Sequence, residues 1–273
     1  MSGDSVLSVL QDRLRLLCVG VSMGWMLGLP GGWVSLAAAA ESVSAAGGVP
    51  GECRAGHLFL TIDTGNMAGA DHIAEVLRAE HVRATFFIAN EPTFRGDLAL
   101  DDHWQGYWRD RVAEGNSFGN HTWTHYTLNR MLKNGNVAGH TLDGKPVEVD
   151  RAGFCEELEK VGTRFQQLTG HTLMPIWRAP GGHTTPRTLA WAAACGYPHQ
   201  VDWTSNGFLG DELPSERFPN QQLLDRALAR LRDGDVMMMH LGIRSRHDPF
   251  AAVFRPLIAG LKERGFCFDT ITH

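Results

Sequence analysis

The sequence predicts an α/β fold built on a parallel, barrel-like sheet. Short apolar segments alternate with segments whose apolar residues have helical spacing, the order begins as strand, helix, strand, and no internal repeat interrupts it. Such a unit joins parallel strands through a crossover helix. The chain has 273 residues, of which 43% are apolar, so it is long enough to bury a substantial core.

The elements are predicted in order from these patterns. Leu58 to Ile62 is an apolar strand, Asp71 to Glu80 has helical spacing, and Ala84 to Ala89 is a second strand. Further helices are expected over 104–114, 154–169, 188–195, 220–232 and 250–264, and further strands over 174–177, 199–203, 236–241 and 267–271. The segment 133–149 is rich in Gly and Asn and is expected to form a surface hairpin or loop.

The first 40 residues have the composition of a secretory signal. Arg13 and Arg15 precede an apolar stretch over 16–29, and the alanines at 37–40 provide a small-residue cleavage site. The apolar stretch is interrupted by glycines and is short for a membrane span of about 20 residues, although an uncleaved anchor helix is the alternative. Residues 41–56 are expected to be a flexible leader and 57–273 the catalytic domain. We therefore expect an exported protein, periplasmic or secreted, with no stable membrane span after cleavage.

Charge and cysteine content narrow the function classes. The net charge of −5 and the pI near 6.2 give no broad basic field, so a nucleic-acid partner is not expected and a neutral or weakly charged substrate fits better.

Four cysteines remain after signal removal: Cys53, Cys155, Cys195 and Cys267. An even number of cysteines in an exported chain permits disulfides. The three possible pairings and four free thiols all stay open.

Polar residues close several of the predicted strands. In α/β barrels the chemistry gathers where strands end at their C-terminal edge, so these positions are the candidates for a site. They are Asp63, Arg178, Asp202 with Trp203, and His240. Each signal is weak by itself, because a lone histidine at a strand end is more often a hydrogen-bonded structural residue.

Two histidines in the stretch GNHTWTH form a further candidate. His121 and His125 lie four residues apart, which on a helical turn places both imidazoles on one side. That spacing suits chelation of one cation at about 2.0–2.1 Å from each nitrogen.

Together these residues form five motifs in a fixed order: TIDTG (61–65), HTWTH (121–125), RAPGG (178–182), HQVDW (199–203) and MMH (238–240). With them, residues 57–271 resemble the polysaccharide deacetylase family, carbohydrate esterase family 4, whose motifs run T-F-D-D-G, H-[ST]-x-x-H, R-x-P, D-x-x-D-W and L-x-H. The resemblance implies a distorted (β/α) barrel of seven or eight strands and a divalent metal, usually zinc and sometimes cobalt or nickel. It also implies removal of an acetyl group from an N-acetylated sugar.

The resemblance implies roles for the matched catalytic residues. Asp63 would be the general base, paired with Arg178, and His240 would protonate the departing amine, with Asp202 orienting and charging its imidazole. Amide hydrolysis needs an activated water, a stabilised oxyanion and a proton for nitrogen. An Asp paired with Arg and a His paired with Asp keep base and acid in opposite protonation states at one pH.

The remaining roles concern the metal and the substrate. His121 and His125 would be metal ligands, since a metal can acidify water and polarise a carbonyl. The residues expected to contact the substrate are Trp203 and Met238, as an apolar wall around the acetyl methyl, and Gly181, whose backbone N–H would help bind the oxyanion.

Two positions depart from the family pattern. His199 replaces the acid that begins D-x-x-D-W, which is expected to affect only loop structure. Thr64 stands where the third metal ligand, an aspartate, is expected. Three interpretations follow: a metal held by His121, His125 and waters, with Thr64 or Asp63 helping; no metal, with Asp63 and His240 working alone; or a degenerate site that only binds glycan.

Two other function classes remain open from the sequence. The first is a metal-independent carbon–nitrogen hydrolase acting on a small cyclic amide, which the expected export disfavours. The second is a catalytically degenerate glycan-binding relative, which the intact acid and base residues disfavour. The glycan itself is not predicted: peptidoglycan, chitin oligomers, an exopolysaccharide or an O-acetyl ester are all compatible with the motifs.

Overall fold

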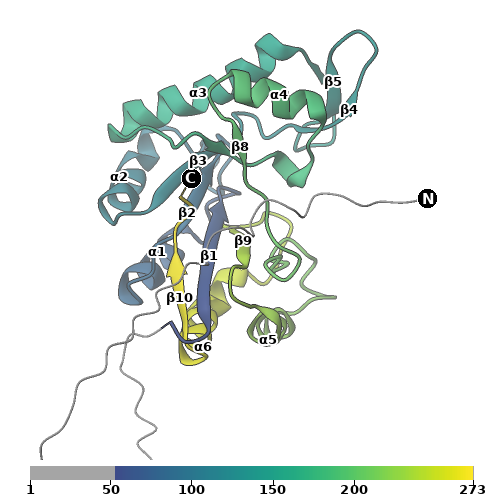
Figure 1. The fold of residues 1–273 in the computed structure, drawn as a ribbon. Coiled ribbons are helices and arrows are strands. Elements are labelled where there is room, and N and C mark those ends of the chain that lie inside the picture. Colours follow the sequence, from purple (N-terminus) through teal and green to yellow (C-terminus); the bar gives the residue numbers. More distant parts are fainter. Residues whose placement is uncertain (1–52, 273) are drawn as a thin grey trace, which may run out of the picture. The chain divides into compact units, whose positions relative to one another are not determined.

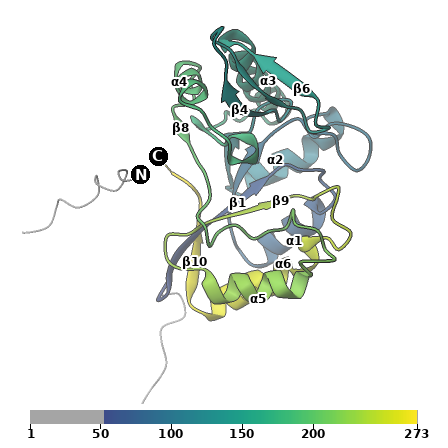
Figure 2. The same ribbon diagram turned by 90° about the vertical axis from the view of Figure 1, so that its right-hand side faces the viewer.

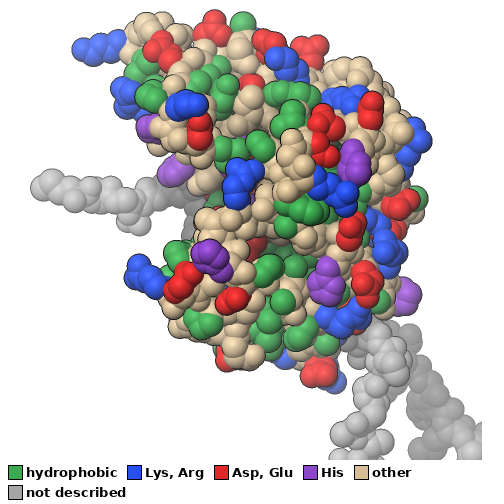
Figure 3. Space-filling model, turned by 180° about the vertical axis from the view of Figure 1, so that it is seen from behind, with side chains coloured by type: hydrophobic (Ala, Val, Ile, Leu, Met, Phe, Trp, Pro, Cys, Tyr) green, Lys and Arg blue, Asp and Glu red, His purple; other side chains and the backbone are tan. Residues whose placement is uncertain are grey.

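The computed structural model describes residues 53–272. The predicted signal peptide and most of the predicted leader lie outside these residues. Within them, no helix combines the length and the apolar character needed to cross a membrane. Figure 3 shows acidic and basic side chains interspersed on one face, in keeping with the small net charge of the chain.

The core is a seven-stranded sheet in which every pairing is parallel (Figure 1). Its strands are β1 (Gly56–Asp63), β2 (Thr85–Ile88), β3 (Ser117–Asn120), β7 (Ile176–Trp177), β8 (His199–Gln200), β9 (Val236–His240) and β10 (Phe266–Asp269). The order is β10-β1-β2-β3-β7-β8, and β9 also pairs with β1. The predicted parallel α/β fold is confirmed.

An irregular segment connects the two ends of this curled sheet. Between β8 and β9, Thr204 N–H donates to Val236 O at 3.2 Å, and Met238 N–H donates to Gly207 O at 2.9 Å. Residues 204–208 therefore bond to the edge of β9 that β1 leaves open, in place of a regular strand. The barrel is distorted because this irregular segment replaces a strand next to β9, the strand that ends in His240.

Helices cover the outer face of the sheet (Figure 1). They are α1 (Ala70–Ala79), α2 (Gln105–Ala113), α3 (Arg151–Thr169), α4 (Pro186–Ala194), α5 (Asn220–Arg230) and α6 (Phe254–Glu263), with short 3₁₀ turns η1 (Asp102–Trp104), η2 (Pro180–Gly182) and η3 (Phe250–Val253). The apolar positions that predicted the first helix, among them Ile73 and Leu77, are buried against the sheet. The largest helix, α3, begins at an Asp150 cap and ends at Gly170 in the left-handed conformation.

A small antiparallel sheet lies beside α3 and α4 (Figure 2). It consists of β4 (Thr127–Met131), β5 (Val137–His140) and β6 (Pro146–Val149). The expected hairpin at 133–149 is confirmed as β5 and β6, and β4 adds a third strand. Glycine is required in β5, because a Cβ on Gly139 would lie 1.8 Å from Thr127 O on β4.

Two disulfides connect distant parts of the described chain. Cys53 pairs with Cys267, which fixes the segment before β1 to β10, and Cys155 pairs with Cys195, which fixes α3 to the end of α4. The structure thus selects one of the three pairings that the sequence left open.

Candidate active site

Asp63 and Arg178 form a buried ion pair at the C-terminal edge of the sheet. Arg178 Nη1 donates to Asp63 Oδ1 at 2.7 Å, and both side chains are almost fully buried. Burial alone would raise the pKa of Asp63, but Arg178, with smaller contributions from His121 and His240, holds it below its ordinary value of 3.8. Asp63 is therefore an ionised carboxylate at neutral pH, and the expected pairing with Arg178 is present.

Arg178 is held by more than this ion pair. Its guanidinium lies 4.2 Å from the ring centroid of Phe87 and 5.6 Å from that of Trp203, so it makes a cation–π contact with each of two aromatic side chains. It also donates to Val201 O and Asp202 O, at 3.1 and 3.4 Å. These contacts fix the guanidinium, and through it the carboxylate of Asp63.

His240 lies next to Asp63 because of strand register. Asp63 ends β1 and His240 ends β9, and the two residues are direct partners in the parallel pairing. Neighbouring strands are about 4.8 Å apart, and paired residues in a parallel sheet project their side chains on the same face. The sheet therefore places a candidate base and a candidate acid side by side.

The carboxylate that orients His240 is Asp211, and the prediction that Asp202 does so is wrong. Both Asp211 oxygens lie 3.2 Å from His240 Nδ1, and Asp211 Oδ2 accepts the His240 backbone N–H at 2.7 Å. Asp202 is exposed, and its Oδ1 accepts the N–H of the next residue, Trp203, at 2.9 Å. Asp211 lies in the irregular segment after β8, nine residues after Asp202, which is the position that the motif assigns to this role.

The environment of His240 favours its charged form. Burial opposes the imidazolium, but Asp211, followed by Asp63 and Glu212, raises the pKa of His240 from 6.5 to about 10. Glu212 Oε2 lies 3.9 Å from His240 Nε2, on the side away from Asp211. The imidazole is therefore a protonated acid between two carboxylates, and the site contains an ionised base beside it.

His121 and His125 come together, but not on a helical turn. They lie in the loop after β3, where His125 has a φ of 55°, and their ring centroids are 4.7 Å apart. His121 Nδ1 lies 2.9 Å from Arg178 O, a carbonyl that can only accept, so the imidazole proton is on Nδ1. Nε2 then carries a lone pair, and this atom lies 3.5 Å from Asp63 Oδ2. Burial lowers the pKa of His121 to about 3, so this imidazole is neutral. Nδ1 of His125 is buried without a partner among the described residues.

Thr64 does not supply the missing metal ligand. Its hydroxyl donates to Phe87 O at 3.0 Å and accepts the Ala89 N–H at 2.9 Å, so it connects β1 to β2. In residues 53–272, no group of three His, Cys, Asp or Glu side chains could hold a metal ion. Catalytic zinc sites use three protein ligands, so the two histidines alone do not match the usual donor set.

The predicted substrate-contacting residues lie around the ion pairs. Met238 is buried on β9, and the Trp203 ring stacks on Phe208 with centroids 6.4 Å apart. Gly181 has a φ of 63° in η2, directly after the Arg178 strand end. Met238 lies two residues before His240 on β9 and Trp203 contacts the Arg178 guanidinium, while the roles of all three residues toward a substrate stay predictions.

Sequence reasoning missed three acidic residues of this region. Asp211 and Glu212 lie in a loop that no motif covers, so only the contact with His240 reveals them. Glu91 is buried after β2, and its Oε1 accepts the N–H of Gly65 at 3.0 Å. Position 65 requires glycine, because its φ is 56° and a Cβ would lie 2.2 Å from Gly242 O. Glu91 therefore holds the turn that follows Asp63 and Thr64.

Comparisons with known proteins agree with this architecture. The family model described as polysaccharide deacetylase matches residues 51–199, more than half of the chain. An uncharacterized 30.6 kDa protein of Geobacillus stearothermophilus is 24% identical over 222 residues, covering 78% of this chain and 69% of the relative.

Two solved structures show the same fold. A family 4 carbohydrate esterase from Streptomyces lividans in complex with acetate has 20% identity and a TM-score of 0.58, covering 80% of this chain and 93% of that one. A CE4 family pseudoenzyme from Bacillus anthracis has 18% identity and a TM-score of 0.59, covering 81% of this chain and 65% of that one. Deacetylases of this family generally use a divalent metal. By its sequence match and its fold, the chain belongs to the polysaccharide deacetylase family.

Proposed function

We propose that this protein hydrolyses the acetyl group from an N-acetylated glycan outside the cytoplasm. One observation carries the proposal: register partners on adjacent strands place an ionised Asp63 beside a protonated His240, and each has its own oppositely charged partner. A relic that only binds glycan has no need for such a matched pair. The acetate bound to the Streptomyces lividans relative is the product expected for this reaction.

The chemistry follows from the protonation states. Asp63 accepts a proton from water as the water oxygen attacks the acetyl carbon, and the carbonyl becomes a tetrahedral oxyanion. The N–H of Gly181 is the proposed donor to this oxyanion. His240 then gives its proton to the sugar nitrogen as the carbon–nitrogen bond breaks, which releases acetate and a free amine. Trp203 and Met238 enclose the acetyl methyl.

Arg178 and Asp211 act as positioning residues in this scheme. Arg178 keeps Asp63 ionised and oriented, and Asp211 keeps the His240 imidazole charged with Nε2–H available. No step passes through a metal, because the residues at the site do not form the usual three-ligand set. Zinc, cobalt or nickel bound weakly by His121 and His125 is the alternative proposal for this region.

The proposed location outside the cytoplasm has two supports. The order of charged, apolar and small residues over 1–40 is that of a secretory signal. The two disulfides are of the kind that persists in oxidising compartments and is rare in the cytoplasm.

A second candidate function is glycan binding without catalysis. Thr64 favours it, because a hydroxyl bonded to backbone stands at the position of the third ligand, and the fold is also that of a Bacillus anthracis pseudoenzyme. The two functions are separated by incubating the mature protein with acetylated glycans and measuring acetate and product masses. Loss of one acetyl mass with release of acetate supports the hydrolase. Glycan binding with no mass change in any member of the panel supports the binding protein.

A further inference from the structure

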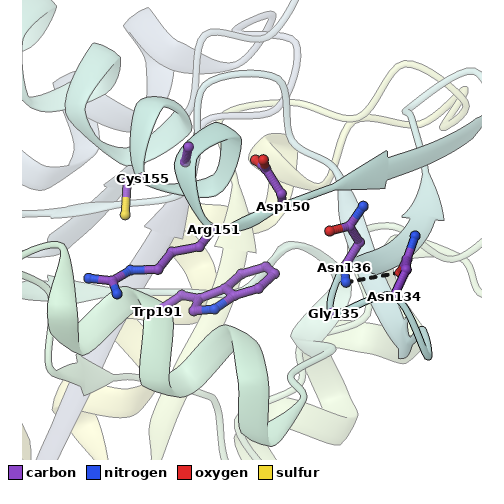
Figure 4. A pocket seen from close by; sticks show the side chains of 8 residues that line it. Asn134, Gly135, Asn136, Asp150, Arg151, Cys155 and Trp191 are labelled. Atoms are coloured by element: carbon purple, nitrogen blue, oxygen red, sulfur yellow. Dashed lines mark hydrogen bonds between the residues drawn. The ribbon is translucent and has the colours of Figure 1, made fainter.

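A cavity of about 520 Å³ lies between the small antiparallel sheet and two helices (Figure 4). Its walls are the turn between β4 and β5, the first turn of α3 and the middle of α4. They are formed by Asn134, Gly135, Asn136, Asp150, Arg151, Ala152, Cys155 and Trp191. None of these residues belongs to the active site.

Side-chain contacts hold the walls of this cavity together. Arg187 on α4 donates from Nη1 to Leu132 O at 3.0 Å and to Asn136 O at 2.8 Å, so it fixes the β4–β5 turn to α4. The disulfide between Cys155 and Cys195 fixes the first turns of α3 to the end of α4. The cavity is therefore formed before any ligand arrives, which lowers the entropy cost of binding.

The chemistry of the lining suits a sugar ring. Trp191 is half-buried and packs against Phe154 at a centroid distance of 5.9 Å, and Figure 4 shows its indole among Arg151, Asp150 and Asn136. A large flat aromatic surface accepts the C–H face of a pyranose, and planar polar groups at its rim accept and donate hydrogen bonds to hydroxyls.

The polar groups at the rim are oriented and partly free. The side-chain amides of Asn134 and Asn136 both donate to Glu148 Oε1, at 2.7 and 2.6 Å, and Asn134 Oδ1 accepts the backbone N–H of Asn136 at 3.1 Å, which leaves the side-chain oxygen of Asn136 without a donor among the described residues. Arg151 is exposed and makes no hydrogen bond or ion pair with any described residue. Its five donors are therefore available to a ligand.

The antiparallel sheet connects this cavity to the active site. β4 begins at Thr127, which lies beside Gly181: a Cβ on Gly181 would be 3.7 Å from Thr127 Cγ2. β4 has five residues, so its far end, Met131, is about 13 Å from Thr127. A polymer held at the active site can extend over this distance, whereas a disaccharide is too short.

We propose that the cavity around Trp191 is an accessory glycan-binding site, which holds a sugar unit of the same polysaccharide chain whose acetyl group is at Asp63 and His240. The proposal rests on the proposed function for the identity of the polymer. Attachment at two points makes the second contact intramolecular and raises the apparent affinity for long chains only.

The test compares long and short N-acetylated oligosaccharides. Binding is measured by calorimetry with the Asp63→Asn protein, so that the ligand is not consumed, and with the same protein carrying Trp191→Ala or Arg151→Ala. We expect about tenfold weaker binding of a long oligosaccharide in both double variants, and unchanged binding of a disaccharide. Leu189→Ala, an exposed change on α4, is the matched control and should leave both ligands unaffected.

Trp191→Phe keeps an aromatic ring against Phe154, and it replaces Trp191→Ala in the binding measurement if the alanine variant fails to fold. It should weaken the long ligand less than Arg151→Ala does. Long-chain binding that is equal in all variants overturns the accessory site, even if the wild-type protein releases acetate. Long-chain binding that depends on Trp191 supports the accessory site even if the wild-type protein releases no acetate, and that lack of release would by itself refute the hydrolase.

Discussion

Replacing Asp211 by Asn should move the alkaline limit of activity to lower pH. Activity requires ionised Asp63 and protonated His240, so it should extend from below the ordinary carboxylate range up to the pKa of His240 at about 10. That pKa is more than three units above the ordinary histidine value of 6.5. The folded protein therefore favours the imidazolium over the neutral ring, relative to a histidine in water, by about 5 kcal/mol. Asp211 is the largest cause of this rise.

The size of the shift follows from the distance between the two groups. Asp211 lies 3.2 Å from His240 Nδ1, and an opposite charge this close changes a pKa by about 1–3 units. The limit should therefore fall to between about pH 7 and 9 in Asp211→Asn, while Asp63 and Glu212 still favour the charged imidazole. At pH 7 a loss of about tenfold or more in kcat is expected, because the ring also loses its orienting partner.

The assay is the pH profile of acetate release, together with NMR titration of the His240 ring, which does not require activity. Asp202→Asn is the matched control, since it removes the acid that the motif pattern assigns to this role. An alkaline limit that Asp202→Asn lowers and Asp211→Asn leaves unchanged would show that Asp211 does not set the pKa of His240.

Four further outcomes are expected. Asp63→Asn and His240→Ala should each lower turnover by about 10²-fold or more while the protein stays folded by circular dichroism, and near-normal activity in either would contradict the assignment. Thr64→Val should cost about 1–3 kcal/mol of unfolding free energy in denaturant titrations, because it leaves Phe87 O on β2 and the Ala89 N–H just after β2 without their hydroxyl partner; no loss would show that these bonds are unimportant. Thr64→Asp should raise the zinc content of the purified protein, and adding His121→Ala should lower it again, whereas equal contents would show that this histidine holds no metal. N-terminal sequencing should find a mature chain that begins near Glu41 outside the cytoplasmic membrane, and recovery of the initiator methionine from a cytoplasmic fraction would refute export.

The strand-end residues could be predicted because they follow regular apolar strands. Asp63 and His240 are the last residues of β1 and β9, Arg178 directly follows β7, and parallel pairing brings the ends of these strands to one edge. β3 was not predicted, because its four residues SFGN include only one large apolar side chain and show no alternation of apolar and polar residues. Its strand character comes from pairing with β2 and β7, which sequence patterns do not show.

The partner of His240 could not be predicted for a related reason. Asp211 reaches the imidazole from an irregular segment, and irregular segments have no periodicity that fixes where a side chain points. The motif position, Asp202, is occupied by the expected residue type, so the sequence alone favours the wrong acid. Thr64 is similar: its residue type indicates a lost ligand, but only the structure shows that its hydroxyl bonds to the backbone of β2.

In the proposed reaction, Asp63 and His240 hydrolyse an acetyl–nitrogen bond with water. The most direct measurement is mass spectrometry of acetate released from an N-acetylated oligosaccharide in H₂¹⁸O, with the wild-type protein, Asp63→Asn and Arg151→Ala. We expect ¹⁸O-labelled acetate and a free amine from the wild-type protein and from Arg151→Ala with a disaccharide, and at least a 100-fold lower rate from Asp63→Asn. Release of labelled acetate at the same rate by Asp63→Asn, or no release from any N-acetylated glycan by the wild-type protein, would contradict the proposed reaction.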